Sequence, residues 1–101
     1  MKYVFLLTKG PFSAECKSVV ELASSAAQQK IETELFVMMD GAYALVDKRI
    51  RNLADNGVKV TYCFHNSEER HAGPPDGSSY TQGGIPEFSG ILSESDRLFS
   101  F

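Results

Sequence analysis

Hydrophobic and polar positions divide the chain into alternating strand-like and helix-like segments. Residues 2–8 and 32–39 each contain a continuous apolar run, which is typical of strands buried on both faces of a parallel sheet. Residues 58–64 alternate between apolar and more polar positions and predict a third strand. Its two faces are Val58, Val60, Tyr62 and Phe64 on one side, and Lys59, Thr61 and Cys63 on the other.

Apolar residues at helical spacing predict the intervening helices. Ser13 is a suitable cap for a helix over residues 13–29, and a second helix is predicted over residues 43–56. Gly57 follows that helix where a left-handed terminus favours glycine. The other predicted elements are a short helix over 66–71 capped by Asn66, a surface loop over 73–84, a helix over 86–95 and a last strand over 97–101.

The predicted element order is β-α-β-α-β-α-α-β. This order indicates an α/β fold with a mostly parallel sheet, right-handed crossovers and helices on both faces. A chain of 101 residues is long enough for one hydrophobic core, so residues 1–101 are expected to form a single domain. The 43 % hydrophobic and 23 % charged content is ordinary for a folded protein.

Charge and terminal sequence narrow the set of partners. A formal net charge of −3 argues against nucleic acid, because binding phosphates needs a basic face. The apolar run at residues 3–7 is too short to cross a membrane, and no small-residue cleavage site follows it. We therefore expect a cytoplasmic protein without a membrane partner. Its two cysteines form no CxxC pair and suggest neither a structural disulfide nor a metal site.

The strongest candidate for chemistry is Cys63, at the end of the predicted strand 58–64. In α/β folds, the carboxyl ends of strands are where ligands bind and reactions occur. The helix predicted directly afterwards would favour the thiolate, the reactive form of cysteine. We therefore predict Cys63 as the active residue.

Two histidines, His65 and His71, follow Cys63 closely. They could pair with the thiol or ligate a metal, or they could be exposed side chains; their spacing matches no common zinc pattern. The basic side chains at residues 70–71 would favour the thiolate form of Cys63, and the acidic side chains at residues 68–69 would disfavour it. No metal ligand is predicted.

Two further positions leave alternatives open. Cys16 lies on the apolar face of the first helix and is interpreted as a buried, inert thiol, or as a resolving thiol for Cys63 if the first and third strands are neighbours. Residues 40–43 (Asp-Gly-Ala-Tyr) are either a turn and helix start or the lining of a crevice. Residues 9–11 match neither a dinucleotide nor a P-loop fingerprint, so no cofactor is predicted.

Four segments together resemble the DsrE/DsrF-like family, which includes the TusD-type sulfur-relay subunits. They are the strand and Gly-Pro loop at residues 3–11, the strand and Asp-Gly-Ala-Tyr turn at 35–43, the strand 57–63 ending in Cys63, and the closing segment 95–101. The resemblance implies a flavodoxin-like or Rossmann-like subunit that assembles into homo-trimers or hexamers, or into hetero-oligomers. It also implies that Cys63 takes up sulfane sulfur as a persulfide and passes it to a partner such as a TusA-like sulfur carrier.

Three functional hypotheses follow. The first is a sulfur carrier or sulfurtransferase subunit that uses Cys63. The second is a non-catalytic oligomerising or small-ligand-binding subunit of the same fold. The third is a thiol-based redox or metal-responsive protein in which Cys63 acts with His65 or His71.

Overall fold

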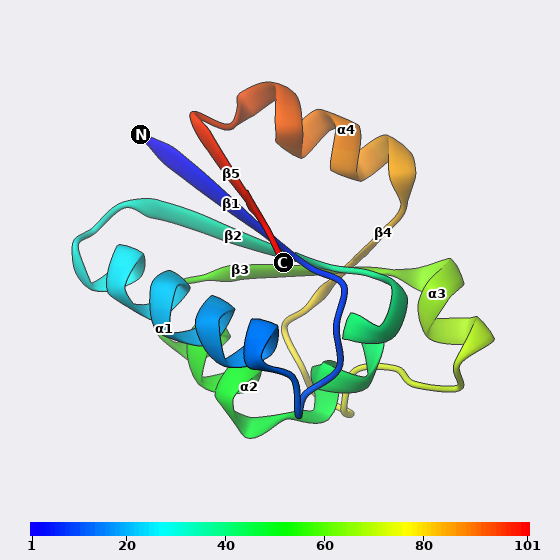
Figure 1. Cartoon of the computed structure of the whole chain (residues 1–101). Helices are drawn as coiled ribbons and strands as arrows, with labels where there is room; N and C mark the ends of the chain where they lie inside the picture. Colours follow the sequence, from blue (N-terminus) through cyan, green and yellow to red (C-terminus); the bar gives the residue numbers. More distant parts are fainter.

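The computed structural model describes residues 1–101 and contains one five-stranded sheet in the order β4-β3-β2-β1-β5 (Figure 1). Every neighbouring pair of strands is parallel, which confirms the predicted α/β class. The strands are β1 (Lys2–Leu7), β2 (Glu32–Val37), β3 (Lys59–Cys63), β4 (Thr81–Gly83) and β5 (Arg97–Ser100).

Helices cover both faces of this sheet. One face packs against α1 (Ala14–Gln28) and α2 (Lys48–Asp55), and α4 (Ile85–Glu94) crosses the other (Figure 1). A 3₁₀ helix, η1 (Met39–Val46), and a short helix, α3 (Phe64–Glu69), follow β2 and β3 at the carboxyl edge. None of the helices combines the length and apolar composition that crossing a membrane requires.

The main core lies between the sheet and the α1–α2 layer. Apolar side chains of β1, β2 and β3 meet the small residues of α1 there, so the helix approaches the strands closely. Phe5 and Phe99 stack with ring centroids 4.9 Å apart, which joins the last strand to this core. The other face is covered more thinly, since α4 has no buried residue.

The single helix predicted over residues 43–56 was wrong. The chain forms η1 and then α2, because Asp47 has extended backbone (ψ 132°) and begins a new helix. Its carboxylate accepts a hydrogen bond from the Arg49 N–H at 2.8 Å, which is the capping arrangement that starts a helix. Val46, just before the break, is exposed. Gly57 has φ +96°, so the predicted left-handed helix end is confirmed.

The predicted loop over residues 73–84 contains a strand that the sequence did not indicate. Residues Thr81, Gln82 and Gly83 form β4 and pair with the end of β3. Three residues without an apolar pattern give no periodic signal, and the strand exists because the backbone of β3 offers it a hydrogen-bonding edge.

Other predicted boundaries differ by a few residues. Phe64 begins α3 rather than ending β3, and Met39 belongs to η1 with a left-handed φ of +53°. Asn66 lies inside α3, where Cys63 takes the cap position. Ile85, the first residue of α4, is exposed although it is apolar.

Candidate functional site

Cys63 occupies the junction between β3 and α3. It is the last residue of the strand and the N-cap residue of the helix, with φ −77° and ψ 112°. Its side chain makes no capping hydrogen bond, and the residue is 6 % exposed. It is absent from the core cluster that holds Val60 and Tyr62 of the same strand. The alternation of β3 therefore directs Cys63 to the α4 side of the sheet.

The neighbour of Cys63 on the edge of the sheet is Gly83. The two residues are partners in the β3–β4 register. A Cβ atom at Gly83 would lie 3.1 Å from Cβ of Glu87 and 3.1 Å from Cγ2 of Thr61. The absence of a side chain therefore lets α4 approach the sheet next to the thiol. Sequence reasoning missed this glycine because it was assigned to a loop.

Two side-chain contacts join η1 to α3 beside Cys63. The backbone N–H of Met39 donates to Oδ1 of Asn66 at 2.8 Å, and Nε of Arg70 donates to Oδ1 of Asp40 at 2.9 Å. Asp40 raises the pKa of the Arg70 guanidinium through this hydrogen bond. Asp40 is therefore the ion-pair partner of Arg70. Tyr43, at the end of the segment 40–43, is about half exposed.

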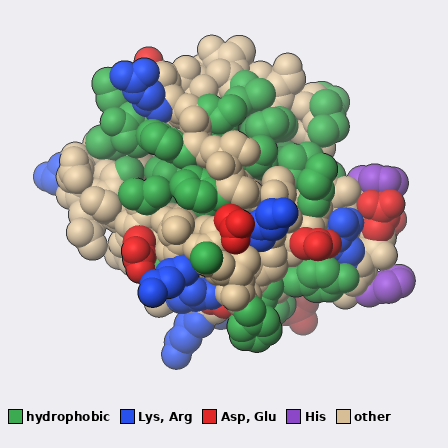
Figure 2. All heavy atoms as spheres, in the orientation of Figure 1, with side chains coloured by type: hydrophobic (Ala, Val, Ile, Leu, Met, Phe, Trp, Pro, Cys, Tyr) green, Lys and Arg blue, Asp and Glu red, His purple; other side chains and the backbone are tan.

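The two histidines lie at the outer end of the molecule. Figure 2 shows them at the edge occupied by α3 in Figure 1, together with acidic side chains. Nε2 of His65 is 3.6 Å from Oε2 of Glu69, and His71 follows α3 with φ +50°. No group of three or more His, Cys, Asp or Glu side chains has a metal-binding arrangement. His65 thus lies at the surface, next to the carboxylate of Glu69 on its own helix.

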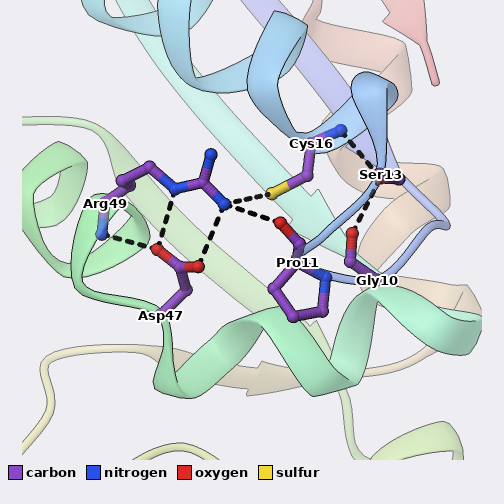
Figure 3. A network of polar contacts seen from close by, with 6 residues as sticks. All are labelled: Gly10, Pro11, Ser13, Cys16, Asp47 and Arg49. Carbon is purple, nitrogen blue, oxygen red and sulfur yellow. Dashed lines mark hydrogen bonds and ion pairs between the residues drawn. The ribbon is translucent and has the colours of Figure 1, made fainter.

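The second thiol, Cys16, belongs to a separate polar network (Figure 3). Nη2 of Arg49 lies 3.8 Å from Sγ of Cys16, 2.6 Å from the Pro11 carbonyl oxygen and 3.0 Å from Oδ2 of Asp47. Ser13 caps α1 by accepting from the Cys16 N–H at 3.0 Å. Burial raises the pKa of the Cys16 thiol, against the opposing effect of Arg49. The network joins the start of α1 to the start of α2.

Cys16 does not meet the condition for a resolving thiol. The sheet order places β2 between β1 and β3, so the first and third strands are not neighbours. Cys16 is in the core between the sheet and α1, whereas Cys63 is not. Both cysteines are free. The sequence contains one signal near Arg49: Asp47, two residues earlier, is a residue type that caps helices. The contact between Arg49 and Cys16 has no signal of its own.

Cys16 is expected to react with iodoacetamide only when the protein unfolds. The residue is 0 % exposed, and burial raises its pKa, so the native state presents neither access nor thiolate. The test is the alkylation rate of a Cys63→Ser variant, in which Cys16 is the only thiol, across a urea series. The rate should rise with the unfolded fraction; fast alkylation without urea would contradict the buried site.

Asp47→Asn is expected to lower the free energy of unfolding at pH 7 by about 1 kcal/mol, since asparagine keeps the cap but loses the ion pair. Hydrogen bonds from Arg49 lower the pKa of Asp47 from its usual 3.8. The higher free energy of unfolding of the wild type should therefore be fully present above about pH 3.8. It should disappear as pH falls through the lower pKa that Asp47 has in the folded protein. Urea unfolding of both proteins from pH 7 to pH 2 measures this; a difference that persists at the lowest pH would contradict it.

The comparisons with known proteins agree with the sequence resemblance. The model of the DsrE/DsrF-like family matches residues 1–101. The crystal structure of the YchN protein from E. coli superposes with a TM-score of 0.85 at 18 % sequence identity, covering 100 % of this chain and 99 % of that one. At that identity the likeness establishes the fold. No curated protein matches the chain.

Proposed function

Because the chain belongs to the DsrE/DsrF-like family, we propose that Cys63 holds sulfane sulfur as a persulfide and passes it to a cysteine of a partner protein. The observation that carries the proposal is the place of Cys63, at the carboxyl end of β3 and the cap of α3. Its side chain has no capping hydrogen bond, so no contact of that kind must break before the sulfur reacts.

The proposed chemistry is two successive thiol exchanges. The Cys63 thiolate attacks the outer sulfur of a donor persulfide; a new S–S bond forms at Cys63, the donor S–S bond breaks, and the donor leaves as a thiolate. In the second exchange, the thiolate of the partner attacks the outer sulfur of the Cys63 persulfide, and Cys63 leaves as a thiolate. Sulfur only changes its carrier, so no external oxidant or cofactor is needed.

A TusA-like sulfur carrier is the acceptor we propose, and a homo-trimer or hexamer the assembly, with a hetero-oligomer as the alternative. The cytoplasm is the compartment proposed, since a persulfide carrier needs reduced thiols. The paired contacts of Met39 with Asn66 and of Asp40 with Arg70 hold η1 beside α3. These contacts are the ones a docking partner would have to accommodate next to Cys63.

One observation favours the second hypothesis, a non-catalytic oligomerising or ligand-binding subunit. Cys63 is only 6 % exposed, and a carrier must present its thiol to two other proteins. A carrier therefore requires a local opening around Cys63, whereas a scaffold subunit requires none. The two hypotheses differ in whether sulfur leaves the protein.

Transfer of labelled sulfur tests the proposal. Cys16→Ser protein, which retains Cys63 alone, is treated with sulfur-labelled polysulfide, desalted and mixed with a TusA-like carrier. The label should move to the carrier, and Cys63→Ser protein should transfer none. Label that stays on the chain, or that never binds to it, is the result expected of a scaffold subunit.

A further inference from the structure

A groove of about 260 Å³ lies between α4 and the sheet. It is lined by side chains of β1, β2, β3, β4 and α4, and neither cysteine takes part in it. In Figure 1, α4 crosses the sheet on the side opposite to α1 and α2, so the groove is on the thinly covered face. The charged character of its lining distinguishes it from the apolar core.

Strand register forms the floor of the groove. Glu34 of β2 is the partner of Lys59 in β3, and Thr61 of β3 is the partner of Thr81 in β4. These four residues line the groove. Glu34 and Thr61 are more than nine-tenths buried, with 6 % and 2 % exposure. The floor therefore consists of polar residues whose backbone positions are fixed by the sheet.

Two buried oxygen atoms of this floor have no hydrogen-bond partner. Oε1 of Glu34 is 3.0 Å from Nζ of Lys2, but Oε2 of the same carboxylate is unpartnered. Oγ1 of Thr61 is unpartnered as well. Buried polar atoms are nearly always paired, because an unpaired one loses its water without replacement. Glu34 and Thr61 both line the groove, so a donor that enters its floor would pair with these two oxygens.

The charges of the groove indicate a cationic donor. Its acidic side chains are Glu34, Glu87 and Glu94, and its basic ones are Lys2 and Lys59, which leaves a formal charge of −1. These carboxylates do not form a metal-ligating group, and Lys2 already occupies one oxygen of Glu34. An ammonium group carries three N–H donors and needs no such ligand set.

We propose that this groove binds a small primary ammonium ion. Oε2 of Glu34 and Oγ1 of Thr61 accept two of its N–H groups, and the carboxylate of Glu87 lies on the α4 side of the same groove. Lys59 is exposed, so its flexible side chain can move to admit the ligand. The site is independent of Cys63 and of sulfur transfer.

The experiment is an NMR titration of the full chain with ethylammonium chloride, with tetramethylammonium chloride as a cation of equal charge that has no N–H donor. The variants are Glu34→Gln and Thr61→Val, the second of which removes the hydroxyl without changing any charge. Glu32→Gln is the matched control, because Glu32 lies on the same strand and does not line the groove.

Ethylammonium should cause saturable shifts in β2, β3 and α4, and tetramethylammonium should cause none. The dissociation constant should rise about tenfold or more in Glu34→Gln and several-fold in Thr61→Val, and stay unchanged in Glu32→Gln. Absence of saturable shifts would mean that water alone occupies the groove and would overturn the proposal. Equal responses to the two cations, or equal affinity in all four proteins, would overturn it too.

Discussion

Gly41→Ala is expected to lower the free energy of unfolding by about 2–3 kcal/mol. A Cβ atom at this position would lie 2.5 Å from the carbonyl oxygen of Leu7 and 3.0 Å from Cγ1 of Val37. The nearer obstacle is backbone at the end of β1, which cannot rotate away as a side chain would. The strain would displace η1, which contacts α3 and β3 beside Cys63. Urea unfolding at pH 7 measures the loss.

Gly90→Ala is the matched control for this prediction. Gly90 lies inside α4, and a Cβ atom there meets nothing within 4 Å. Alanine in a helix interior is more stable than glycine by about 0.5–1 kcal/mol, so this variant should equal or exceed the wild type. Equal stability of Gly41→Ala and Gly90→Ala would contradict the close approach of η1 to β1.

Lys2→Met is expected to lower the free energy of unfolding by about 3 kcal/mol, because it removes the partner of a buried carboxylate. The side chains of Lys2 and Glu34 are 11 % and 8 % exposed, and their charged atoms are 3.0 Å apart. The carboxylate of Glu94 lies 3.3 Å from Nζ of Lys2 but is largely exposed. Water solvates it when Lys2 is replaced, so it contributes little to the loss of stability. The expected loss therefore comes from Glu34. Thermal and urea unfolding measure it.

The double variant Lys2→Met/Glu34→Leu separates this cause from lost packing. Replacing both charges should recover most of the stability, since a buried ion pair contributes little relative to apolar residues of similar size. Burial lowers the pKa of Lys2, but hydrogen bonds to Glu34 and Glu94 outweigh it and raise the pKa above 10.5. The wild-type advantage over Lys2→Met should thus be complete below pH 10.5 and decline at higher pH. A double variant as unstable as Lys2→Met would contradict an unpaired Glu34 carboxylate as the cause.

The sequence predicted the fold well where apolar periodicity was long. The runs in β1 and β2 and the alternation in β3 placed the three central strands within two residues of their observed ends. It failed at two places for different reasons. β4 has no periodic pattern and forms by pairing with β3, which is a tertiary contact. The break at Asp47 is local, and it depends on one capping hydrogen bond that the helical spacing of the apolar residues does not reveal.

The candidate site was predictable in position but not in surroundings. The end of β3 and the start of α3 were expected next to Cys63, and the structure has the helix begin at Phe64. Gly83 lies beside Cys63 because β4 pairs with β3, and the sequence did not predict β4. The contact of Asn66 with Met39 joins residues 27 positions apart, a separation that no local pattern encodes. The active role of Cys63 stays a prediction.

The most direct test of a persulfide on Cys63 is the intact mass of the protein after treatment with polysulfide, for the wild type, Cys63→Ser and Cys16→Ser. The wild type and Cys16→Ser should each gain one sulfur atom, which reductant removes, and Cys63→Ser should gain none. Cys16→Ser is the control for the buried thiol. An adduct that persists in Cys63→Ser, or no adduct on any folded protein, would contradict a persulfide carried by Cys63.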